Sequence, residues 1–244
     1  MYINKKLEAE EIALTVCFTA LYVVFGFLPI SPIIGLPGKA ITAAAIMAPI
    51  MGIILGPYLG MLSTILGGII GFFAGSFSPP SFVSGIVAAS CGGMLYTGKR
   101  SLCALTYFSL LFLFSFYPSV GPVWLYPPLM WFQIAGFLLL ISPLQSSAIK
   151  SLASSNNSNN LQAFFITSLT STLAGQIAGS LTFEVLPWPI LLANVKAWEI
   201  YWQGLTVLYP VERIIIALIS SFMGAALYKV LKSSNLMQVL THAS

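Results

Sequence analysis

Long apolar runs with almost no charge fill this chain, and they limit its possible folds more than any other feature. Only 7% of its 244 residues are charged, against about 25% in an ordinary soluble domain. The mean hydropathy is +0.94. Because a membrane-spanning helix needs about 20 mostly apolar residues, the chain is predicted to be an all-α, polytopic membrane helical bundle. No length is left for a separate soluble domain, so residues 1–244 are expected to form a single membrane domain.

Prolines, glycines and charges divide the chain into eight apolar segments, each of which is a candidate transmembrane span. The fourth and fifth segments are short enough to be tilted or re-entrant, so the pattern predicts about six to eight crossings. The segments lie near residues 11–29, 39–56, 57–76, 81–97, 102–118, 123–143, 161–186 and 208–232.

The basic residues are distributed unevenly between the predicted loops. With eight spans and a cytoplasmic N-terminus, the outer loops receive only Lys39 and Lys196, and Arg213 lies near the outer end of the last span. A cytoplasmic excess of Lys and Arg is typical of membrane proteins, so we expect a multi-pass protein of the cell membrane with both termini in the cytoplasm. Basic residues spread this thinly do not resemble a nucleic-acid-binding surface, and no nucleic-acid partner is expected. The residues assigned to the inner side are Lys5, Lys6, Lys99, Arg100, Lys150, Lys229 and Lys232.

Small residues recur at every fourth position between Ala40 and Gly68. The hydrophobic effect does not drive helices together in lipid, so small residues matter because they let two backbones approach closely. The register therefore predicts a packing surface, which could serve this bundle alone or a partner protein. Gly56-Pro57 is expected to break the stretch into a tight helical hairpin, because Pro57 lacks a donor and disfavours helical geometry at Gly56. The helix-packing glycines are Gly52, Gly56, Gly60 and Gly68.

Residues 188–213 form the predicted outer loop that differs most from the others, because three of the five tryptophans lie there beside several charged side chains. Two interpretations are open: an aromatic belt at the membrane interface, or a lid over a binding site. The second places a solute between this loop, Glu184 and Arg213, with Gln176 two helical turns below Glu184 on the same face. A purely structural ion pair between Glu184 and either Arg213 or Lys196 is the alternative. The candidate substrate-binding residues are Gln176, Glu184, Trp188, Trp198, Trp202 and Arg213.

The sequence lacks residues that several kinds of catalytic site and metal site require. The chain has no Asp and a single histidine, His242, so a Ser-His-Asp triad, an aspartyl protease and a histidine-rich metal site are excluded. No GxxxxGK[ST] motif occurs, so the chain cannot hydrolyse ATP through a P-loop of its own. The cysteines Cys17, Cys91 and Cys103 lack CxxC spacing and are expected to be buried free thiols. The sequence therefore predicts no catalytic residues, no metal site and no cofactor.

Three classes of function remain. The first is a membrane-embedded subunit that binds a solute and depends on partner proteins for energy. The second is a self-contained secondary transporter or channel, for which Glu184 is the one carboxylate deep in an apolar run. The third is a membrane enzyme, which has no recognised motif in its favour. Dependence on a partner separates the first class from the others.

The first hundred residues carry a series of small-residue motifs. An AxxxA motif, AEEIA at residues 9–13, opens the first span and is followed by ALY at residues 20–22. The outer loop PISPIIGLPGK then leads into the glycine-rich hairpin that ends GPYLGMLSTILGGIIGFF. In this order the chain resembles the substrate-binding subunit, or S component, of energy-coupling factor (ECF) vitamin transporters. The likeness covers mainly residues 9–100, with a weaker similarity in the last helix, IIIALISSFMGAALYKVLK.

The resemblance implies a small helical bundle that binds a vitamin or similar small organic solute from outside. A separate transmembrane coupling protein with two ATPases would drive release inside. In this chain Ala9 and Ala13 would dock on the coupling protein, residues 29–39 would form one gate, and residues 187–209 another. Members of the family typically have six spans, whereas this chain is predicted to have two more, around residues 102–143. The metal-binding N-terminal histidine of the nickel and cobalt members is absent.

Overall fold

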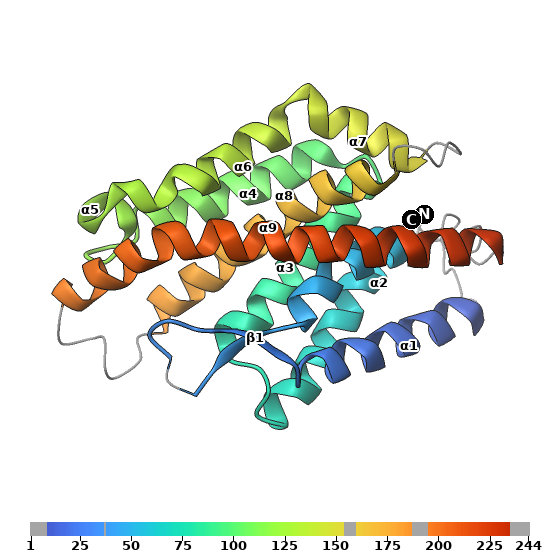
Figure 1. Cartoon of the computed structure of the whole chain (residues 1–244), viewed down its shortest axis with the longest axis horizontal. Helices are drawn as coiled ribbons and strands as arrows, with labels where there is room; N and C mark the ends of the chain where they lie inside the picture. Colours follow the sequence, from blue (N-terminus) through green and yellow to red (C-terminus); the bar gives the residue numbers. More distant parts are fainter. Residues whose placement is uncertain (1–8, 37, 154–159, 187–194, 235–244) are drawn as a thin grey trace, which may run out of the picture.

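The computed structural model of the chain describes residues 9–36, 38–153, 160–186 and 195–234. Within these residues the fold is almost wholly helical, and its sheet is a single short β-hairpin. The prediction of an all-α fold is confirmed. The elements are α1 (Ala9–Phe25), β1 (Pro29–Pro32), β2 (Ala40–Thr42), α2 (Ala44–Phe73), α3 (Pro79–Tyr96), α4 (Arg100–Ser115), α5 (Pro122–Leu125), the 3₁₀ turn η1 (Pro127–Met130), α6 (Trp131–Ile141), α7 (Pro143–Ala153), α8 (Asn160–Val185) and α9 (Val195–Ser233). Helix α9 runs along the long axis of the molecule, and α4, α6 and α8 lie roughly parallel to it (Figure 1).

Judged by length and composition alone, two of the described helical elements could cross a membrane: α2, when it is taken as one element, and the part of α9 from Ala197 to Ser233. The pair α6 and α7, bent by 61°, makes a third if it counts as one span. Many large apolar side chains are exposed, among them Val16 at 60%, Phe73 at 85% and Phe222 at 62%. A soluble monomer rarely exposes this much apolar surface, and contact with lipid accounts for it. These features support the membrane prediction, whereas the number of crossings and their orientation stay predictions.

The α2 segment is two helices joined by a sharp reversal at Gly56. This glycine has φ 80° and ψ 176°, a conformation that other residues almost never adopt. A Cβ atom placed on Gly60 would lie 2.9 Å from the Cα of Gly52. In one straight helix these residues would be about 12 Å apart. The chain therefore folds back on itself at Gly56-Pro57, where the sequence predicts a hairpin.

Other glycines of α2 lie directly against α3. A Cβ atom on Gly52 would lie 2.8 Å from the carbonyl carbon of Ala89, and the Ala89 carbonyl oxygen is closer still. A Cβ atom on Gly68 would lie 2.5 Å from Phe82 Cε2, and Phe82 Cδ2 is closer still. Real Cβ contacts are almost never this short, so neither position accepts a side chain unless its neighbour moves. A Cβ atom on Gly56 would meet nothing within 4 Å, so the requirement there is for backbone conformation rather than for space.

Helix α8 lies in the middle of the bundle and is buried on nearly all sides, between α3, α9, α4 and α7 (Figure 1). Several of its hydroxyl side chains are satisfied within the helix: Thr170, Ser171 and Thr172 donate to the carbonyls four residues earlier at 3.0, 2.8 and 2.8 Å. Polar residues can therefore occupy a buried helix at little cost. Ser168 Oγ, in contrast, has no hydrogen-bond partner among the described residues. The close approach of α3 depends on Gly175, because a Cβ atom there would lie 2.6 Å from the Ser84 carbonyl oxygen.

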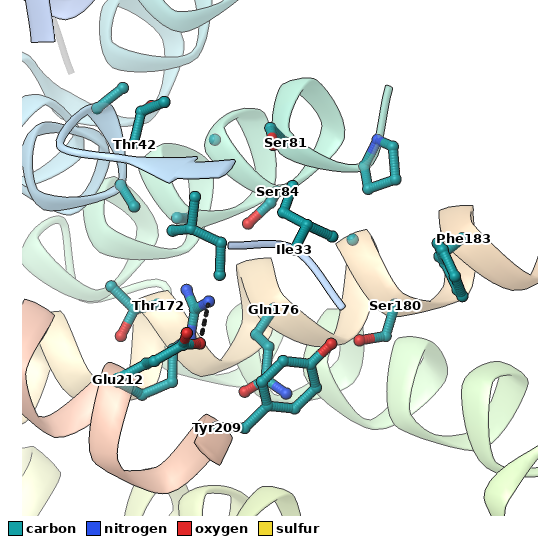
Figure 2. Close-up of a pocket in the computed structure, with 18 of the residues that line it drawn as sticks. Ile33, Thr42, Ser81, Ser84, Thr172, Gln176, Ser180, Phe183, Tyr209 and Glu212 are labelled. Carbon is teal, nitrogen blue, oxygen red and sulfur yellow. Dashed lines mark ion pairs between the residues drawn. The ribbon is translucent and has the colours of Figure 1, made fainter. Parts of the chain in front are cut away.

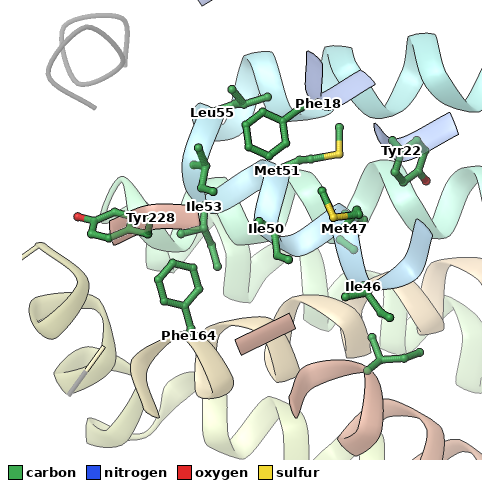
Figure 3. Close-up of a cluster of buried hydrophobic side chains, with 14 of the residues drawn as sticks. Phe18, Tyr22, Ile46, Met47, Ile50, Met51, Ile53, Leu55, Phe164 and Tyr228 are labelled. Carbon is green, nitrogen blue, oxygen red and sulfur yellow. The ribbon is translucent and has the colours of Figure 1, made fainter. Parts of the chain in front are cut away.

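Two apolar clusters hold the helices together. The first joins α1, α2, α8 and the C-terminal half of α9, where Phe18, Met47 and Phe164 are almost fully buried (Figure 3). Tyr228 extends this cluster, since its ring lies 5.7 Å from that of Phe164 and its hydroxyl donates to the Leu152 carbonyl at 2.9 Å. The second cluster joins α3, α4, α6, α8 and the N-terminal part of α9.

The structure corrects three details of the sequence predictions. Residues 195–207, expected in an outer loop, belong to α9, because apolar side chains on one face of this stretch pack on the second cluster and extend the helix. The expected span 123–143 is broken into α5, η1 and α6 at prolines, which cannot continue a helix. Cys17 is exposed on α1, whereas Cys91 and Cys103 are buried free thiols as expected.

Candidate functional site

A cavity lies at the end of the bundle where the β-hairpin is found. It encloses about 950 Å³ of empty space, including its open mouth, and it is lined by α1, the hairpin, α2, α3, α8 and α9. Figure 2 shows how side chains from these separate elements converge on the same space.

Helices α8 and α9 form the polar wall of the cavity. Gln176 and Ser180 lie one turn apart on α8, and Tyr209 and Arg213 lie one turn apart on α9, so each pair shares a helix face. Figure 2 shows the hydroxyl groups of Tyr209 and Ser180 turned toward each other. Gln176 is 4% exposed, and neither its amide oxygen nor its amide nitrogen has a hydrogen-bond partner among the described residues.

One ion pair belongs to this wall. Arg213 Nη2 lies 3.8 Å from Glu212 Oε2, and both side chains are buried (Figure 2). Neither Arg213 Nε nor Glu212 Oε2 has a hydrogen-bond partner in the described part of the chain. The pair is electrically neutral as a unit, but it leaves hydrogen-bonding capacity unused.

The rest of the lining is partly aromatic and also includes the hydroxyl side chains of Thr42, Ser81 and Ser84. Phe77 follows α2, Tyr22 comes from α1, and Phe183 comes from α8. The Tyr22 hydroxyl occupies the place that a side chain on Gly85 would need, and the Tyr22 Cζ would lie 3.2 Å from a Cβ atom there. Gly85 thus makes room for the hydroxyl end of Tyr22 against α3 at the cavity.

The β-hairpin covers this end of the bundle. Strand β1 pairs antiparallel with β2, and Ile33 and Ile34 line the cavity from the segment that follows β1. The Ser31 hydroxyl donates to Glu212 Oε1 on α9. On the other side Lys39 Nζ donates to the Gly75 carbonyl at 2.8 Å. The hairpin is therefore tied to α9 and to the turn between α2 and α3.

The structure brings together only part of the predicted binding site. Gln176 and Arg213 both line the cavity. Glu184 is 2% exposed and is absent from the lining, and its carboxylate oxygens have no hydrogen-bond partner among the described residues. Arg213 pairs with Glu212 rather than with Glu184, so the alternative ion pair predicted between Glu184 and Arg213 does not form. The side chain of Lys196 lies outside the described residues.

The predicted aromatic lid lies elsewhere. Trp198 and Trp202 are 2% and 1% exposed and belong to the second apolar cluster, not to the cavity lining. Trp202 packs edge-on to Phe114 at 5.7 Å and donates to the Val120 carbonyl at 2.9 Å. Trp188 lies outside the described residues. Any part these tryptophans have in solute binding stays a prediction.

Sequence reasoning did not select Ser31, Tyr209 or Glu212 as site residues. The spacing of Tyr209, Glu212 and Arg213 at i, i+3 and i+4 places them near one face of a helix, which is a usable signal. No comparable signal links Ser31 to Glu212, because 181 residues separate them.

The predicted docking residues Ala9 and Ala13 are exposed on α1, a helix that packs chiefly against α2. In the described part of the chain, no group of three His, Cys, Asp or Glu side chains lies close enough to hold a metal ion. No known protein family, no curated protein and no solved structure matches this chain.

Proposed function

We propose that this chain is a membrane-embedded subunit that binds a small organic solute and is energised by a partner coupling protein with ATPase subunits, like an ECF S component. The observation that carries the proposal is the cavity, which is mostly apolar and has buried, unpaired polar side chains on one wall. An unpaired buried polar group costs about 1–3 kcal/mol. A bundle with a purely structural role has no use for such groups beside empty space, whereas a solute supplies their partners.

The distribution of basic residues supports uptake from outside. The end of the bundle opposite the cavity holds Lys99, whose ammonium lies 5.3 Å from the centre of the Tyr58 ring. It also holds Arg100, which donates to the carbonyls of Leu140 and Ser142 at 2.8 and 2.9 Å. If basic residues mark the cytoplasmic side, the cavity faces outward in a chain with about eight crossings and both termini inside the cell.

The β-hairpin is the natural candidate for a gate. It covers the cavity, and its bond from Ser31 to Glu212 joins it to the helix that carries Arg213. In the proposed cycle this hydrogen bond breaks when the hairpin opens to admit the solute, and it forms again when the hairpin closes. The gate predicted from residues 29–39 corresponds to this hairpin. The second gate, predicted at residues 187–209, lies partly outside the described residues, and its described part belongs to α9.

The experiment is purification in mild detergent from the source membranes, followed by mass spectrometry of the small molecules and proteins that remain bound. We expect one organic solute together with a transmembrane coupling protein and ATPase subunits. Ala13→Leu should lose the coupling protein and keep the solute, because it enlarges an exposed position on α1. Ala226→Leu, the same change at an exposed position on α9, should keep both. Neither solute nor ATPase subunits with the unaltered chain would refute the proposal.

A self-contained secondary transporter is the second candidate, and Glu184 is the observation that favours it. Its carboxylate is buried without a hydrogen-bond partner among the described residues, as are many carboxylates that carry protons in transporters. Proteoliposomes that contain this chain alone separate the two candidates. Solute accumulation driven by a proton gradient, and abolished by Glu184→Gln, would favour the secondary transporter.

A further inference from the structure

We infer that the solute is an uncharged, flat heterocycle with an amide-type edge, in which a hydrogen-bond donor lies next to an acceptor. This inference rests on the proposed solute-binding function and names the chemical class that the cavity selects. Three features of the lining lead to it: an unpaired amide, a self-neutralised ion pair and aromatic walls.

The amide of Gln176 specifies the edge of the solute. It offers one acceptor and two donors side by side, and none of them has a partner in the described part of the chain. Gln176 lines the cavity and has three rotatable side-chain bonds, so a change of rotamer presents the amide to a bound molecule. A cyclic amide, urea or imide pairs with it reciprocally through two hydrogen bonds. A solute with acceptors alone would leave the glutamine oxygen buried and unsatisfied.

The ion pair excludes a net charge on the solute. Glu212 and Arg213 are the acidic and basic members of the described lining, and they neutralise each other at 3.8 Å. An anionic solute would compete with Glu212 for the Arg213 guanidinium, and a cationic solute would compete with Arg213 for the Glu212 carboxylate. Either competition leaves a buried charge without its counter-charge, which is strongly unfavourable. The free Arg213 Nε can instead donate to a neutral carbonyl oxygen.

The apolar walls favour a flat ring system. Tyr22, Phe77 and Phe183 contribute aromatic rings, and Ile33 and Leu205 add aliphatic surface. Stacked and edge-on aromatic contacts favour a planar partner over a flexible chain of the same size. The lining therefore combines flat apolar contacts with one polar wall, as expected for a fused heterocycle bound by its edge.

The test uses three probes that share one bicyclic ring: 2-quinolone, 1-methyl-2-quinolone and quinoline-2-carboxylate. The first has a cyclic amide edge, the second lacks its N–H donor, and the third is charged. Calorimetric titration of the purified chain in detergent should show 2-quinolone binding about tenfold or more tightly than either of the others. Gln176→Leu should abolish the preference for 2-quinolone over its methyl derivative. Gln203→Leu, the same change at an exposed position on α9, should preserve it.

Equal binding of 2-quinolone and its methyl derivative, tighter binding of the carboxylate, or no binding of any probe would overturn the inferred class. Mass spectrometry of the solute that copurifies with the chain separates this failure from failure of the proposed function. A charged or aliphatic copurified solute would refute the class and leave solute binding intact. No copurified solute and no probe binding would refute both.

Discussion

Replacing Gly52 by alanine tests how closely α2 and α3 pack beside the cavity. The added Cβ atom would lie 2.8 Å from both the Ala89 carbonyl carbon and the Gly93 nitrogen. These are backbone atoms, so no side chain can rotate away. Because the Ala89 carbonyl oxygen would be closer still, α3 must shift by more than about 0.6 Å to restore ordinary contacts of about 3.4 Å. Such overpacking costs about 1–3 kcal/mol, and the rigidity of a backbone neighbour places this case near 3 kcal/mol.

Alanine also favours helix over glycine by about 1 kcal/mol, so the net loss of unfolding free energy should be about 2 kcal/mol. For a chain of this length that corresponds to a fall in Tm of about 4–8 °C. Gly204→Ala is the matched control, because the nearest atom to its Cβ would be Ile34 Cδ1 at 4.0 Å. Gly204→Ala should gain the higher helix propensity of alanine without overpacking, so its free energy of unfolding should equal or exceed that of the unaltered chain.

Thermal unfolding in detergent, followed by the loss of the monomer peak in size-exclusion chromatography, measures both variants. We also expect Gly52→Ala to weaken solute binding, because two residues near the overpacked contact line the cavity. Ala48 lies one helical turn before Gly52 on α2, and Ala88 is next to Ala89 on α3. An unchanged or raised Tm in Gly52→Ala, with Gly204→Ala behaving in the same way, would show that the helices are not in backbone contact at this point.

Three further changes test other parts of the structure. Ser31→Ala removes the hydrogen bond to Glu212 and should speed solute release about tenfold in stopped-flow measurements, since a bond to a charged group contributes about 1.5–3 kcal/mol. An unchanged release rate would argue against the hairpin as a gate. Trp202→Phe removes the hydrogen bond to the Val120 carbonyl and should lower the free energy of unfolding by about 1 kcal/mol without changing solute affinity. A large loss of affinity would show that Trp202 takes part in solute binding. Gly56→Ala should cost about 1–3 kcal/mol of unfolding free energy through backbone strain alone, and a neutral result in thermal unfolding would contradict the reversal at this residue.

Much of the candidate site could be anticipated from the spacing of residues along single helices. Gln176 and Glu184 lie two turns apart on α8, and the sequence predicts correctly that they share a buried helix. What spacing could not reveal is the partner of each group. Arg213 could pair with a neighbour on its own helix or with a residue on another one. In the structure it pairs with Glu212, and Glu184 stays buried on α8 without a counter-charge among the described residues.

The aromatic segment shows the same limit. Tryptophans in a predicted outer loop fit an interface belt and a lid equally well, because both depend on composition alone. The spacing of Trp198 and Trp202 by four residues suits a helix, and the structure packs both against Phe114, Phe183 and each other in the bundle interior. Their burial depends on α4 and α8, which no local pattern in residues 195–207 specifies.

By itself the sequence determined the helical class of this protein, its apolar surface and the break at Gly56-Pro57. These properties follow from composition and from backbone conformation, which act over a few neighbouring residues. Three other properties appear only in the folded protein: the hairpin of β1 and β2 covers a cavity, Ser31 contacts Glu212, and Gln176 has no hydrogen-bond partner among the described residues. These properties depend on contacts between residues far apart in the chain, and such contacts are set by how whole helices pack rather than by any local run of residues.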